Sequence, residues 1–282
     1  MSKPIFFAII AGLAVVVIGG TYAYTQRPER VVGNALQKLA DTEEQHFVAE
    51  IALGSSPATE QLLGEPAQVV ITLDGSFDRN EDERDSLATN VDIGAASDSV
   101  SFQIAGEMRF IGDSAYIYVQ KVPPAVPQLA AIKNQWVSLP RGGQVAGLSA
   151  EASAEEGPLL ANVKKIGSEK INDVSAVKYE AVATDVAVVR LMDHIARLLG
   201  TSLTADQIDS LRANLQGASE LPVTLWVTPA SHRLVKLETR LNPGQSQVRY
   251  TITFPEKDEP VSHTPPERSA PLQEVVANAP AN

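Results

Sequence analysis

The sequence predicts an α+β protein: an antiparallel β half-barrel wrapped around two or three helices, preceded by one N-terminal transmembrane helix. Residues 4–24 contain no charged side chain, and about 1.5 Å of rise per residue makes them long enough to cross a bilayer. Between residues 46 and 254, apolar and polar residues alternate in short runs, as is typical of an antiparallel sheet. Few helices accompany these strands, so the sheet would have to curve around those helices to cover its apolar face.

The apolar segment 4–24 is predicted to be an uncleaved membrane anchor. Its length exceeds the apolar core of a signal peptide, although Thr21-Tyr22-Ala23 would be an acceptable cleavage site, so cleavage stays open. Charge does not decide the orientation in the membrane, because Lys3 precedes the segment and Arg27 and Arg30 follow it.

The rest of the chain divides by composition. Residues 1–3 form a short N-terminal tail, 25–30 a linker, 31–255 the half-barrel domain, and 256–282 a Pro-rich tail. The tail is too poor in apolar residues to offset the entropy of ordering, so it is predicted to be disordered.

Three segments have helical spacing. The first begins the domain and places Val32, Ala35, Leu36 and Leu39 on one face. The second, 184–200, has an apolar arc wider than a surface helix needs. The third begins with a capping box, Thr204 followed by Gln207, and ends near residue 217.

Strands are predicted wherever alternation is clear. They cover 46–53, 67–78, 86–95, 99–110, 115–119, 134–140, 174–183, 221–228, 233–241 and 247–254. The acidic run 80–85 interrupts two of them and is interpreted as a solvated turn. A calcium loop is the alternative, but the run lacks the ligand order of an EF-hand.

The composition excludes several kinds of chemistry. The chain has no Cys, so it has neither disulfides nor thiolate sites, and its net charge of −11 disfavours a nucleic-acid partner. None of the four histidines pairs with another at metal-ligand spacing. Because no nucleophile elbow, Walker loop or dinucleotide fingerprint occurs either, we expect a non-enzyme without cofactor or metal.

The order of several short motifs resembles the mycobacterial LppX/LprG-type lipoproteins, which share the fold of the LolA and LolB lipoprotein carriers. The motifs are Ala35–Leu39, His46-Phe47, Gly112–Tyr116, Trp136–Pro140, Val174–Tyr179, Leu221–Pro229 and Ser231–Val235. The resemblance implies a half-barrel on the outer side of a cell membrane that holds acyl chains in an apolar cavity. That family is tethered by an acylated Cys, which this chain lacks, so the segment 4–24 would replace the lipid anchor.

The sequence therefore predicts a single-pass membrane protein whose C-terminal domain is extracytoplasmic and binds a lipid or an acylated molecule. The candidate cavity residues are Val188, Val189, Leu191, Met192, Ile195, Leu198, Leu199, Trp136 and Trp226. Core packing is the alternative for each of them, and for the two tryptophans it is favoured. The alternative function is a protein-interaction or envelope-sensor domain with a filled core and no lipid ligand.

Overall fold

The computed structural model describes part of the chain in two compact units. The described residues are 28–54, 60, 67–78, 86–96, 101–112, 114–123, 127–140, 159–184, 187, 189, 204–209, 221–241, 248–256 and 261–277. Unit 1 comprises residues 1–42 and 145–255, and unit 2 comprises 43–144 and 256–282. The predicted anchor 4–24 lies outside the described residues, and none of the helices within them is long and apolar enough to cross a membrane.

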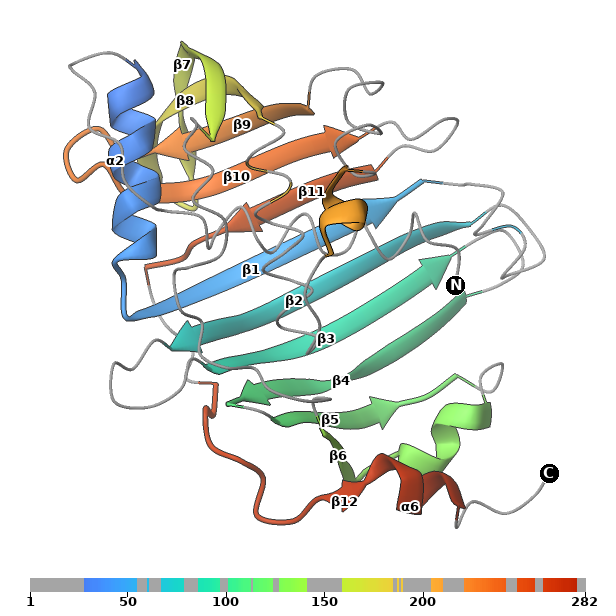
Figure 1. The fold of residues 1–282 in the computed structure, drawn as a ribbon. Helices are drawn as coiled ribbons and strands as arrows, with labels where there is room; N and C mark the ends of the chain where they lie inside the picture. Colours follow the sequence, from blue (N-terminus) through green and yellow to red (C-terminus); the bar gives the residue numbers. More distant parts are fainter. Residues whose placement is uncertain are drawn as a thin grey trace. The chain divides into compact units, whose positions relative to one another are not determined.

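Unit 1 contains helix α2 and a set of antiparallel strands (Figure 1). The elements are α2 (Pro28–Ala40), β7 (Leu160–Ile171), β8 (Val174–Ala183), β9 (Leu221–Val227), β10 (Leu234–Leu241) and β11 (Val248–Thr253), with the strands in the order β11-β10-β9-β8-β7. A two-residue turn joins β7 to β8, and its Asn172 and Asp173 have positive φ angles of 48° and 66°. Positive φ at both turn residues defines a type I′ hairpin, which matches the twist of the strands.

Helix α2 packs against β7, β9 and β10 through the face that the spacing predicts. Val32, Ala35 and Leu39 are 4% exposed or less. The helix begins at Pro28, three residues inside the segment that the sequence assigns to a linker. Proline suits this position, because it has no N–H to satisfy and its fixed φ fits the first helical turn.

Unit 2 contains strands in the order β12-β6-β5-β4-β3-β2-β1. Its elements are β1 (Glu44–Leu53), β2 (Gln68–Asp78), β3 (Ser86–Ala96), β4 (Ser101–Ile111), β5 (Ser114–Lys121), the 3₁₀ helix η1 (Pro127–Ile132), β6 (Trp136–Pro140), β12 (Ala270–Pro271) and α6 (Leu272–Ala277). All pairs are antiparallel except β12 with β6, which are parallel.

The described elements agree with the predicted class, since they are mostly antiparallel strands with few helices. Each predicted strand has a counterpart whose ends differ by three residues or fewer. The capping box is also confirmed: the Thr204 N–H donates to Gln207 Oε1 at 2.9 Å, and the Gln207 N–H donates to Thr204 Oγ1 at 3.3 Å. Helical residues 205–209 follow it, whereas the acidic turn 80–85 lies outside the described residues.

Two predictions fail. Strand β7 has no predicted counterpart, because most of its side chains are exposed and polar and no alternation marks it. The C-terminal segment is predicted to be disordered, yet residues 261–277 include β12 and α6. Contacts with residues far away in the sequence order this segment, and composition does not record such contacts.

Candidate functional site

One face of the unit 2 sheet is apolar across several strands. Opposed residues of an antiparallel pair point to the same face, so the register aligns apolar side chains in rows. Three rows cross β2, β3 and β4: Val69–Ala95–Phe102, Ile71–Ile93–Ile104 and Phe77–Leu87–Phe110. Ile71 is 5% exposed, whereas Phe102, Ile104 and Phe110 on β4 are half-buried. Most apolar side chains of these rows are therefore only half-buried, on all three strands.

The opposite face of this sheet is polar and carries a buried cluster. His46 Nε2 lies 2.6 Å from Asp74 Oδ1, and the His46 side chain is 5% exposed. Next to it, Ser76 Oγ lies 2.7 Å from Nε2 of His263, and Ser86 Oγ lies 2.7 Å from Nδ1 of the same ring. The histidine that contacts Ser76 is not the one that contacts Asp74, so these groups do not form a Ser-His-Asp relay.

His263 favours the neutral form in this cluster. Burial lowers the pKa of the imidazole and nearby Arg109 lowers it further, while the carboxylates of Asp78 and Glu44 act in the opposite direction without cancelling the effect. A neutral imidazole donates through one ring nitrogen and accepts through the other, and a hydroxyl can do either. Ser76 and Ser86 can therefore satisfy both ring nitrogens.

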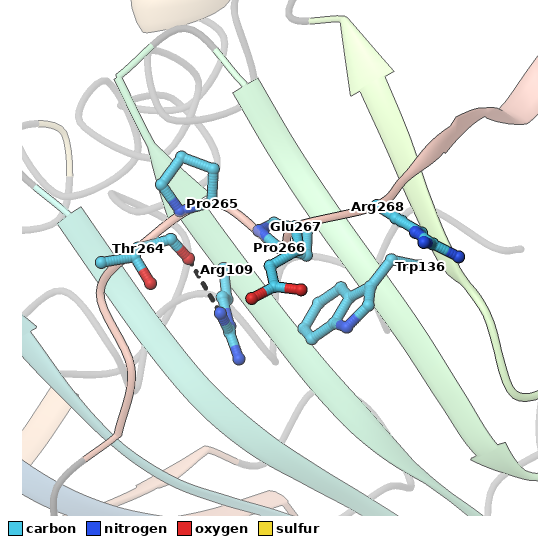
Figure 2. A pocket seen from close by; sticks show the side chains of 7 residues that line it. All are labelled: Arg109, Trp136, Thr264, Pro265, Pro266, Glu267 and Arg268. Carbon is cyan, nitrogen blue, oxygen red and sulfur yellow. Dashed lines mark hydrogen bonds between the residues drawn. The ribbon is translucent and has the colours of Figure 1, made fainter.

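A pocket of about 400 Å³ lies on the polar face between the sheet and the C-terminal segment (Figure 2). It is lined by Arg109, Trp136, Thr264, Pro265, Pro266, Glu267 and Arg268. Arg109 joins the sheet to the C-terminal segment in this pocket. Its Nε donates to Glu107 Oε1 at 2.6 Å, and its Nη1 donates to the Thr264 carbonyl oxygen at 2.8 Å. The Arg109 guanidinium carbon also lies 4.5 Å from the centre of the Trp136 ring.

The lining combines an aromatic surface with fixed hydrogen-bonding groups. Trp136 contacts Tyr118 as well as Arg109, with the two ring centres 5.4 Å apart and the planes tilted by 40°. Such a surface offers cation–π and stacking contacts. It suits a flat or extended polar ligand better than an acyl chain.

The predicted cavity residues of the segment 184–200 are mostly outside the described residues. Val189 is described, is helical and is 2% exposed. Val188, Leu191, Met192, Ile195, Leu198 and Leu199 lie outside the described part of the chain, so their role in a cavity stays a prediction.

The two tryptophans of the prediction lie in different units. Trp136, on β6 of unit 2, is half-buried and lines the pocket. Trp226, on β9 of unit 1, is 3% exposed and packs with Ala176 and Val235. Its Nε1 donates to the Glu169 carboxylate.

Charged groups cover the Trp226 ring from both neighbouring strands. Lys178 on β8 and Lys236 on β10 are its partners in register, and their Nζ atoms lie 5.1 Å and 4.5 Å from the ring centre. These contacts indicate a packed position on the charged face of the sheet, which is the alternative that the sequence favours for this residue.

Of the residues that line the pocket, only Trp136 is among the candidate site residues predicted from the sequence. Arg109 lies in a strand whose alternation predicts only packing, and Thr264–Arg268 lie in the segment predicted to be disordered. For the described residues, no group of three or more His, Asp or Glu side chains could hold a metal ion.

Comparisons with known proteins give likenesses of fold. No protein-family model and no curated protein sequence matches the chain. Among solved structures, the lipoprotein LppX of Mycobacterium tuberculosis is similar, with 17% identity, a TM-score of 0.44 and coverage of 84% of this chain and 98% of LppX. LprF of Mycobacterium bovis gives 15% identity, a TM-score of 0.48 and coverage of 87% of this chain and 99% of LprF. LppX is one of the lipoproteins after which the family resembled by the sequence motifs is named.

Proposed function

We propose that this chain is a membrane-anchored, extracytoplasmic module that binds lipids or acylated molecules. The observation that carries the proposal is the apolar face of the unit 2 sheet, whose rows join half-buried side chains on β4 to buried and half-buried ones on β2 and β3. Covering such a face with an acyl chain removes apolar surface from water, and each methylene buried contributes about 0.8 kcal/mol.

The sequence supports the anchoring and the location. Residues 4–24 have the length and composition of a membrane span, and the motif order resembles lipoproteins of the outer side of a membrane. The proposal assigns binding to the sheet and no catalytic step to any residue.

A binding experiment tests the proposal. A chain of residues 28–282, which contains all the described elements, is purified from cells, and its organic extract is analysed by mass spectrometry. We expect a lipid in stoichiometric amount. Replacing Ile104, on the apolar face, with Lys should reduce the bound lipid several-fold, because a charge in an apolar site is costly.

Gln103→Lys is the matched control, because Gln103 is exposed on the opposite face of the same strand. It should retain the lipid. Reproducible absence of lipid from the unmodified chain would contradict the proposal, as would equal retention by Ile104→Lys when its circular dichroism spectrum is unchanged.

A second candidate function is a protein-interaction domain, which the pocket beside Arg109 and Trp136 favours because its lining is polar and aromatic. Crosslinking in cells separates the two functions. A single dominant protein partner with no lipid in the extract would favour this second candidate.

A further inference from the structure

Residues 261–271, here called the strap, cross the polar face of the unit 2 sheet. His263 reaches Ser76 on β2 and Ser86 on β3. Further on, the Thr264 carbonyl oxygen accepts from Arg109 on β4, and β12 pairs with β6. The strap thus contacts four strands that lie about 130 to 190 residues earlier in the chain. The residues that its hydrogen bonds join to β4, β3 and β2 are 155, 177 and 187 positions apart in the sequence.

The strap is held by polar contacts with little burial. The residues from 261 to 275 are half-buried or exposed, and His263 is one of the half-buried ones, whereas its partners Ser76 and Ser86 are 2% and 9% exposed. Segments that bury little apolar surface belong to the least stable parts of a fold and open locally. The strap can therefore leave the face while the sheet stays folded.

The face beneath the strap has the features of a peptide-binding groove. Trp136 and Tyr118 provide an aromatic surface, and Pro265 and Pro266 lie across the pocket from Trp136 (Figure 2). Aromatic grooves bind proline-containing segments because these segments are already extended and lose little entropy. The edge strand β6 adds a second recognition mode, since β12 pairs with it as an additional strand.

We propose that the polar face of β4, β5 and β6 is a binding groove for extended, proline-containing peptides of a partner protein, and that the strap occupies it as an intramolecular competitor. Arg109 fixes the peptide by donating to a backbone carbonyl oxygen, as it does to Thr264. The groove lies on the face opposite the apolar rows, so this inference does not depend on lipid binding.

The strap competes effectively because it is tethered. A tethered segment has an effective concentration in the millimolar range, which a free peptide has to exceed. Weakening the strap without changing the groove should therefore expose the site. His263→Ala does this, because His263 belongs to the strap and lies outside the pocket lining.

The experiment uses the full chain in detergent and a fluorescent peptide with the sequence of residues 261–275. Anisotropy is expected to show a Kd at least tenfold lower for His263→Ala than for the unmodified chain. His232→Ala, which removes a histidine of unit 1, is the matched control and should bind as weakly as the unmodified chain. Adding Trp136→Ala to His263→Ala should abolish the gain.

A second variant keeps the test decisive if His263→Ala leaves the strap in place. A chain that ends at residue 260 has no strap, and it should bind the peptide at least as tightly as His263→Ala. Failure of this shortened, folded chain to bind the peptide would overturn the proposal. Binding that is unaffected by Trp136→Ala would overturn it too, because the peptide would then occupy another surface.

Discussion

Tyr250 has a buried hydroxyl group that forms no hydrogen bond. Its side chain is fully buried on β11, and its hydroxyl has no hydrogen-bond partner, the one such buried side-chain atom found in the described part of the chain. Burial also raises the pKa of this phenol far above its ordinary value. A buried hydroxyl without a partner costs about 1–3 kcal/mol.

Tyr250→Phe should therefore stabilise the protein, by about 1 kcal/mol in the free energy of unfolding, because it removes the uncompensated hydroxyl and keeps the ring. Urea unfolding followed by circular dichroism measures the change. Tyr179→Phe, at another buried tyrosine in the same sheet, is the control and should change stability by less than about 0.5 kcal/mol. A loss of stability in Tyr250→Phe would show that the hydroxyl has a partner.

Gly75 is a position where the backbone of the next strand leaves no room for a side chain. A Cβ atom there would lie 2.1 Å from the Ala88 carbonyl oxygen and 2.6 Å from the Thr89 Cα. Both are backbone atoms, so relief requires the strands to separate. In contrast, a Cβ atom at Gly167 would have no neighbour within 4 Å.

Gly75→Ala should consequently cost about 2–3 kcal/mol of stability, as overpacking does in well-packed sites. Gly167→Ala should stay within about 0.5 kcal/mol of the unmodified protein. Thermal unfolding of the two variants under the same conditions compares them directly. Similar melting temperatures would mean that β2 and β3 tolerate a wider spacing than the structure has.

Among the elements, the strap responds to pH through His263. Its pKa is lowered when the strap is docked, mainly by burial, so the docked state binds fewer protons than the open state below the ordinary histidine pKa of about 6.5. Docking is then fully favourable above that pH and weakens as the pH falls through it. Asp78 and Glu44 reduce this effect, since they stabilise the imidazolium.

Hydrogen exchange of residues 261–277 should therefore be slow at pH 7.5 and faster at pH 5.5, after correction for the intrinsic pH dependence of exchange. His263→Gln keeps a hydrogen-bonding side chain but does not titrate, so its corrected exchange should not change with pH. Equal corrected rates at both pH values in the unmodified chain would exclude His263 as the origin of the effect.

The predictability of an element depends on where its contacts lie. Strands β8 to β11 could be predicted because apolar and polar residues alternate over part of each one's sequence. The capping box at Thr204 could be predicted because its two members are three residues apart. Strand β7 lacks that signal: its Lys164, Lys165 and Lys170 are all exposed. The strap could not be predicted, because a histidine gives no indication of which distant serines it will contact.

On the scale of the whole molecule, the predicted anchor decides where both units function. Deleting residues 4–24 should move the protein from the membrane pellet to the soluble fraction, since no other apolar stretch of comparable length exists in the sequence. Alkaline carbonate washing and immunoblotting measure the distribution. A chain lacking 278–282 is the control and should remain in the pellet.

Intact-mass measurement distinguishes anchoring from cleavage. An uncleaved chain retains the mass of all 282 residues, with allowance for loss of the initiator Met. A mature chain that begins near residue 24 and is soluble would contradict the anchor and indicate a signal peptide.

The two tryptophans give each unit its own optical reporter. The chain has two Trp residues, with Trp226 in unit 1 between two ammonium groups and Trp136 in unit 2 beside the Arg109 guanidinium. Trp226→Phe would leave an emission that senses the pocket beside Arg109, and Trp136→Phe one that senses the surroundings of Trp226 in unit 1. Intrinsic fluorescence could thus follow ligand binding and unfolding in each half of the protein separately, without an added dye.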